Sequence, residues 1–64
     1  MADRDFLIAR KQAVRREIEQ VRRTLEREQS RPTPIKRRIA PLESQLEKLM
    51  AEEYTLRVAI DQAR

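Results

Sequence analysis

The chain has 64 residues and a formal net charge of +4; 41% of its residues are charged, and glycine is absent. A chain of this length buries little apolar surface, so we expect a single domain over residues 1–64 that depends on a partner for part of its stability. Cysteine and histidine are both absent, which excludes disulfides and metal sites built from thiol or imidazole ligands.

In the first half of the chain, a residue pattern recurs every three or four positions, the spacing that keeps side chains on one face of a helix. This first stripe consists of Leu7, Lys11, Val14, Ile18, Val21 and Leu25. It predicts a helix over about residues 3–29. A charged, disordered chain is the alternative, but such a chain would not keep a sustained heptad phase.

Two prolines interrupt the pattern and predict a turn over residues 30–33. Arg31 and Thr33 each precede a proline, which pushes both residues toward extended backbone. A helix N-cap requires this extended conformation. Thr33 is therefore the expected cap of a second helix, and Pro34 is its expected first residue.

A second stripe predicts a helix over about residues 34–63. Its members are Ile35, Ile39, Leu42, Leu46, Leu49, Glu53, Leu56, Ile60 and Ala63. Pro41 disturbs this helix because it removes the hydrogen-bond donor for the Arg37 carbonyl. Two alternatives remain open: the helix bends at Pro41 and continues, or the main helix begins there. We favour the helix that bends and continues, because the heptad phase is kept across Pro41.

Folding the chain at the turn brings the two stripes together. We therefore predict an all-α fold, an antiparallel helical hairpin with a coiled-coil seam. Each stripe has one charged member, Lys11 in the first and Glu53 in the second, and these two residues then lie opposite one another. We interpret them as a pair that sets the register of the seam. The plain alternative is a chance alignment of two long side chains that both reach solvent.

Further apolar residues gather toward the open end of the hairpin, away from the turn. They are Phe6, Ile8 and Ala13 on the first helix and Met50, Tyr54 and Val58 on the second. Two helices alone cannot cover faces this wide, so we predict an interface with a partner. The simplest partner is a second hairpin, which gives an antiparallel four-helix bundle. The plain alternative is a set of scattered exposed side chains.

Positive charge gathers toward the turn. Residues 10–38 include 11 basic and 4 acidic residues, a net charge of +7, and the rest of the chain carries −3. Two basic groups can contact phosphates or an acidic protein: Arg31, Lys36, Arg37 and Arg38 at the tip, and Arg16, Arg23 and Arg27 on the first helix. The plain alternatives are neutralisation of the tip by Glu26 and Glu28, and an ordinary salt-bridged helix face.

The sequence offers no catalytic constellation, because it lacks a histidine base, a cysteine nucleophile and a glycine-rich phosphate loop. We therefore expect a non-enzymatic protein without a cofactor, a bound metal or a small-molecule substrate. Our leading hypothesis is a protein–protein interaction module that self-associates or docks on a larger protein through its apolar open end. Such a module can serve as a regulator, a scaffold factor or a small subunit.

The alternative hypothesis is a regulator that binds the backbone of RNA or DNA through the basic tip and the basic row of the first helix. Phe6 and Tyr54 are the only aromatic residues and belong to the open end, so base stacking is not expected.

The mixed charge of the N-terminal residues and the lack of a long apolar run predict neither a secretion signal nor a membrane span. With no cysteine to oxidise, we expect a cytoplasmic location.

Overall fold

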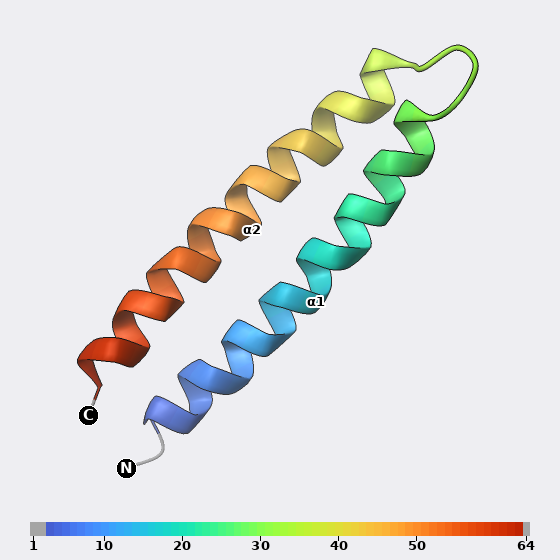
Figure 1. The fold of residues 1–64 in the computed structure, drawn as a ribbon. Helices are drawn as coiled ribbons and strands as arrows, with labels where there is room; N and C mark the ends of the chain where they lie inside the picture. Colours follow the sequence, from blue (N-terminus) through green and yellow to red (C-terminus); the bar gives the residue numbers. More distant parts are fainter. Residues whose placement is uncertain (1–2, 64) are drawn as a thin grey trace.

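The computed structural model describes residues 3–63, which form two α-helices of 27 residues each, α1 (Asp3–Gln29) and α2 (Lys36–Gln62). The helices lie side by side and antiparallel, with the turn at one end and the start of α1 beside the end of α2 at the other (Figure 1). The hairpin is a rod with extents of 51 × 14 × 12 Å. The described residues contain no strand, and the predicted helical hairpin is confirmed.

One apolar seam between the helices holds the hairpin together. Its buried residues are Val14, Ile18, Val21, Leu49 and Leu56, and Leu7, Leu42 and Leu46 pack against them. Every one of these residues belongs to a predicted stripe, so the heptad spacing identified the core. Full burial of one such side chain stabilises a fold by roughly 1.5–3 kcal/mol. From a core this small we expect an isolated hairpin of only marginal stability.

α2 continues through Pro41 without interruption. This confirms that the helix continues across Pro41 and rules out the alternative in which the main helix begins there, while the bend at Pro41 stays a prediction. Proline has no amide hydrogen, so the Arg37 carbonyl lacks its usual helical donor. Both residues are exposed, and water can satisfy that carbonyl.

The start of α2 differs from the prediction by two residues. The N-cap is Ile35, with φ of −106° and ψ of 111°, and no side-chain hydrogen bond caps the helix. Thr33 is therefore not the cap, and Pro34 lies outside the helix. The Ile35 carbonyl closes the first turn by accepting the amides of Arg38 at 3.0 Å and Ile39 at 3.1 Å. Proline suits both an extended turn and a first helical position, so its sequence position alone did not locate the first turn.

Candidate interaction surfaces

The predicted seam pair, Lys11 and Glu53, is half-buried at both positions. Glu53 Oε1, however, accepts a hydrogen bond from Arg57 Nη2 on its own helix at 2.6 Å. The salt bridge that crosses between the helices joins Arg10 Nη2 to Glu52 Oε2 at 2.8 Å. Within the described part of the chain, no ion pair joins Lys11 to Glu53. The role of this pair in setting the register therefore stays a prediction.

The surface of the hairpin has two faces that flank the seam. The bridge face carries the salt bridge between Arg10 and Glu52. The groove face has an open groove of about 620 Å³ between the helices. The groove is lined by Arg15, Arg16, Ile18, Glu19, Arg22, Met50, Glu53, Tyr54 and Arg57. Glu52 is two residues from both Met50 and Tyr54, about 200° around α2, which places the bridge and the groove on opposite sides of the seam.

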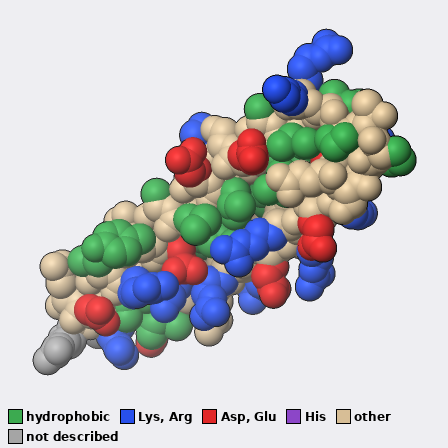
Figure 2. All heavy atoms as spheres, turned by 45° about the horizontal axis from the view of Figure 1, so that its top comes forward, with side chains coloured by type: hydrophobic (Ala, Val, Ile, Leu, Met, Phe, Trp, Pro, Cys, Tyr) green, Lys and Arg blue, Asp and Glu red, His purple; other side chains and the backbone are tan. Residues whose placement is uncertain are grey.

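Several large apolar side chains remain exposed to solvent. Their exposed fractions are 70% for Phe6, 65% for Tyr54, 47% for Met50, 38% for Ile35 and 37% for Val58. Figure 2 shows one face of the rod, on which groups of hydrophobic side chains are separated by charged ones along its length. The exposed apolar surface is therefore broken into groups on this face.

The six residues predicted as an interface are divided between the two faces. Helical spacing from Arg10 puts Phe6 and Ala13 on the bridge face. Ile8 lies on the groove face with Met50 and Tyr54, and the i+4 position Val58 extends the row of Met50 and Tyr54. One partner helix cannot cover both faces, so the groove face and the bridge face must be considered separately. The interface role of the six residues stays a prediction.

The groove joins an apolar strip to a charged rim. Ile18 is buried in it, whereas Met50 and Tyr54 are exposed. On the α1 side, Arg15, Glu19 and Arg22 are exposed and form no ion pair with any residue in the described range. None of these three residues was predicted to belong to a binding surface. Their i, i+4, i+7 spacing directly beside the first stripe was the signal that could have found them.

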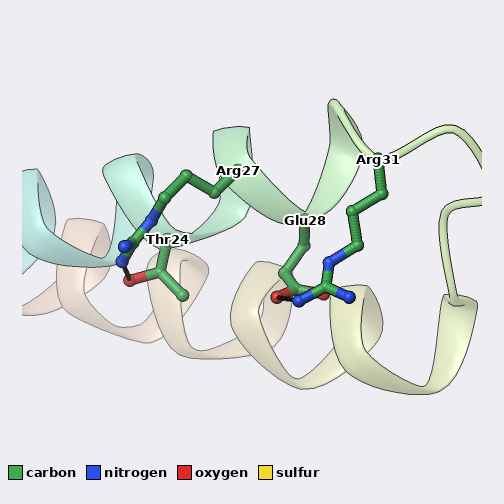
Figure 3. Close-up of polar contacts among 4 residues, drawn as sticks. All are labelled: Thr24, Arg27, Glu28 and Arg31. Atoms are coloured by element: carbon green, nitrogen blue, oxygen red, sulfur yellow. Dashed lines mark hydrogen bonds and ion pairs between the residues drawn. The ribbon is translucent and has the colours of Figure 1, made fainter.

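The residues of the predicted basic row on α1 line two different hollows, and the binding role of the row stays a prediction. Arg16 lines the groove. Arg23 and Arg27 line a separate depression together with Gln20, Glu26 and Ser30. Arg27 Nη2 donates a hydrogen bond to Thr24 Oγ1 at 3.4 Å (Figure 3). Because Glu26 lies among these arginines, the depression carries mixed charge.

The basic residues of the tip differ in their partners. Arg31 Nη2 pairs with Glu28 Oε2 at 3.2 Å (Figure 3). Lys36, Arg37 and Arg38 are exposed, lie in the first turn of α2, and form no ion pair among the residues that the structure describes. That turn contains no acidic residue. Cations at a helix N-terminus oppose the helix dipole. The predicted neutralisation thus applies to Arg31 and does not extend to the other three.

Glu28 places a carboxylate in the seam beside the turn. It follows Leu25 at i+3, which extends the first stripe by one step, and its side chain is 14% exposed. Its Oε1 atom is shielded from solvent and accepts no hydrogen bond from the described residues. A buried acceptor without a partner costs about 1–3 kcal/mol. The seam is therefore weaker at the tip than in its middle.

No protein-family model, curated protein or solved structure matches the chain. Functional inference therefore rests on the geometry of the hairpin. Over residues 3–63, neither helix combines the length and the hydropathy that crossing a membrane requires. The same residues contain no group of three or more histidine, cysteine or acidic side chains placed to hold a metal ion.

Proposed function

We propose that the chain is a non-enzymatic protein–protein interaction module that associates through exposed apolar side chains. The observation that carries this proposal is the exposure of Tyr54 at 65% and Met50 at 47% beside a groove that is already formed between the helices. In its simplest form the module is a homodimer, in which two hairpins make a four-helix bundle. In its other form the hairpin docks on a larger protein as a regulator, scaffold factor or small subunit.

Two physical arguments support association. Exposed apolar side chains that lie in register on one helix form a patch, and such patches mark interaction sites more often than scattered residues do. The small core is the second argument, because a partner that binds only the folded hairpin stabilises it by mass action. The absence of cysteine fits a reducing compartment, so the proposal places the module in the cytoplasm.

The proposal is tested by titration with a fluorescent probe peptide. The probe is an amphipathic helix of about 20 residues, or about 30 Å, with leucine on one face and uncharged glutamine on the other. We expect micromolar binding that changes less than about threefold between 0.1 and about 1 M salt, because apolar contacts are not screened. Tyr54→Lys should weaken binding at least about tenfold, since it puts a charge into the apolar strip.

The matched control is Thr55→Lys, which adds the same charge at the next exposed position of α2. Thr55 points about 100° away from Tyr54 around the helix, so this variant should bind the probe like the wild type. Sedimentation equilibrium of the unliganded chain reports the assembly state in parallel. If neither probe binding nor self-association responds to Tyr54→Lys, the proposed function is wrong.

A second candidate function is binding to the RNA or DNA backbone through the tip. The favouring observation is the cluster of Lys36, Arg37 and Arg38, which has no acidic neighbour in its turn. A gel-shift titration at two salt concentrations with the double variant Arg37→Glu/Arg38→Glu tests it. Phosphate binding should weaken steeply as salt rises and disappear in the variant. If the wild type shifts no nucleic acid at low salt, this candidate is excluded.

A further inference from the structure

Four exposed side chains on α1 alternate in charge along one line of the helix. This alternating row consists of Arg15, Glu19, Arg22 and Glu26. The spacings of four, three and four residues keep the row on one helical face. Arg15, Glu19 and Arg22 line the groove, and Glu26 lies at the neighbouring depression nearer the turn.

The members of the row make no ion pair within their own chain. The salt bridges of the described residues join Arg10 to Glu52, Arg31 to Glu28, and Arg57 to Glu53. Four alternating charges beside an apolar strip therefore make no contact ion pair in the isolated hairpin, although each has an oppositely charged neighbour along α1. Charges that flank an apolar helix seam commonly choose the partner and its orientation.

The order of charges in the row is self-complementary in one orientation. Read along α1 the signs are plus, minus, plus, minus; read against α1 they are minus, plus, minus, plus. An antiparallel second copy therefore places Arg15 opposite Glu26 and Glu19 opposite Arg22, and two-fold symmetry repeats both pairs. A shift by one step along the row brings like charges together. Repulsion therefore disfavours the neighbouring registers relative to this one.

The same arrangement covers exposed apolar residues. The Arg10–Glu52 bridge fixes which residues of α1 and α2 lie at the same level of the rod. With the row centred on the two-fold axis, Met50 and Tyr54 of one copy lie at the level of the other copy's turn. Ile35, which is 38% exposed, lies beside that turn. The arrangement therefore brings exposed apolar side chains of the two copies to the same level of the bundle.

Charge at the two ends favours the same orientation. Residues 10–38 carry a net charge of +7 and the rest of the chain carries −3. Antiparallel packing moves each basic tip toward the less basic open end of the other copy, whereas packing with both tips at one end brings Lys36, Arg37 and Arg38 of the two copies together. Nucleic acid fits the row less well, because Glu19 and Glu26 would repel phosphates.

We propose that the alternating row on the groove face docks on the same row of a second, antiparallel copy of this chain. The inference rests on the proposed interaction function and names the partner, the face and the register. Two hairpins joined in this way form a four-helix bundle in which α1 faces α1 and α2 faces α2.

Charge exchange within the row tests this proposal by sedimentation equilibrium. Arg15→Glu/Arg22→Glu makes the row entirely acidic, and Glu19→Arg/Glu26→Arg makes it entirely basic. Each variant alone should dimerise at least about tenfold more weakly than the wild type at low salt, because four attractive pairs become repulsive. An equimolar mixture of the two should form a heterodimer. Recovery in the mixture would also exclude misfolding as the cause of the loss.

The matched control is Arg23→Glu/Arg27→Glu, which makes the same change of net charge at two residues of α1 that belong neither to the row nor to the lining of the groove. It should dimerise like the wild type. Mixed with the entirely basic variant, it should form no heterodimer. The net charges of these two chains are changed in opposite directions, but this general attraction does not hold a dimer together without complementary charges in the row. Heterodimer formation in this control mixture would contradict the assignment to the row.

Orientation is measured independently with a spin label on Thr33→Cys at the tip. The antiparallel register places the Gln29 ends of the two α1 helices about 26 Å apart along the rod, from the helical rise of 1.5 Å per residue, and the tip labels lie beyond these ends. Labels within about 20 Å would mean that the tips lie together and would overturn the proposal. A wild-type chain that remains monomeric at millimolar concentration, or a dimer indifferent to both row variants, would overturn it as well.

Failure of this inference is distinguishable from failure of the proposed function. If the row variants leave association unchanged while Tyr54→Lys abolishes probe binding, the row is wrong and the interaction function stands. If the row variants alter association while Tyr54→Lys changes neither association nor probe binding, the apolar basis of the function is wrong. The proposal would also be overturned by a single-stranded RNA that competes with dimer formation and no longer binds the entirely acidic variant. RNA would then be the occupant of the row in place of the second copy.

Discussion

The same two stripes form the seam in the middle of the hairpin and at its tip, but their side chains are more deeply buried in the middle. In the middle, Val14 is 0% exposed and Leu49 is 8% exposed. Toward the tip, Leu25 and Ile39 are only half-buried, and Ile35 is 38% exposed. Heptad spacing decides which side chains face the partner helix. The depth to which they are buried depends on what surrounds each position in three dimensions.

Three features weaken the tip relative to the middle. Glu28 puts a partly unsatisfied carboxylate into the seam, and α2 starts without a side-chain cap. Pro41 removes one backbone hydrogen bond from the second turn of α2. The Glu28–Arg31 pair offsets only part of this, because a salt bridge with an exposed arginine contributes little. We expect the tip to open before the middle when the hairpin unfolds locally.

The largest expected difference between the two regions comes from one substitution made at two places on α2. Leu49→Ala should lower the free energy of unfolding by about 3 kcal/mol, because it leaves a cavity in the buried seam. Leu42→Ala, at a half-buried position nearer the tip, should cost about 1.5 kcal/mol. Urea titration followed by circular dichroism measures both values. Equal losses would contradict the comparison.

Pro41→Ala should stabilise the hairpin by about 2 kcal/mol. The substitution restores an amide donor for the Arg37 carbonyl and removes the steric conflict of proline in a helix interior. Amide hydrogen exchange should slow mainly in the first turns of α2 and little at Leu56. An unchanged free energy of unfolding would mean that the helix already accommodates the proline without strain.

Glu28→Leu should stabilise the tip by about 1 kcal/mol, because it replaces an unsatisfied seam carboxylate with an apolar side chain. Glu17→Leu is the matched control at an exposed position of α1 outside the alternating row and should change stability by less than about 0.5 kcal/mol. Thermal unfolding at one protein concentration compares the two variants. A destabilised Glu28→Leu variant would show that the bond to Arg31 outweighs the unpaired oxygen.

The smallest expected effect concerns the charge pairs across the seam. A double-mutant cycle with Arg10→Ala and Glu52→Ala should give a coupling energy of about 0.5 kcal/mol, because both partners are partly exposed. The cycle with Lys11→Ala and Glu53→Ala should give less, since Glu53 is engaged by Arg57. A larger coupling for Lys11 and Glu53 would support the register-setting role predicted from the heptads.

The stripes were sufficient to predict two helices, their antiparallel packing and every member of the buried core. They succeeded because a residue spacing of three or four directly encodes one helical face. The same logic failed to place the first turn of α2, where proline is compatible with two conformations. The predicted interface at the open end includes Phe6 and Tyr54, which helical geometry puts on opposite sides of the seam, and its role stays a prediction.

The sequence by itself determined the seam. Apolar periodicity defines one face on each helix, and the simplest way to bury both faces across a proline-containing turn is to pack the helices against each other. Only the tertiary structure decided which charges meet across the seam. Arg10 and Glu52 are 42 positions apart and are brought together by the packing of the two helices, whereas Glu53 and Arg57 are i, i+4 neighbours on one helix. The groove face also depends on the tertiary structure, because residues of both helices line it and neither helix alone forms it.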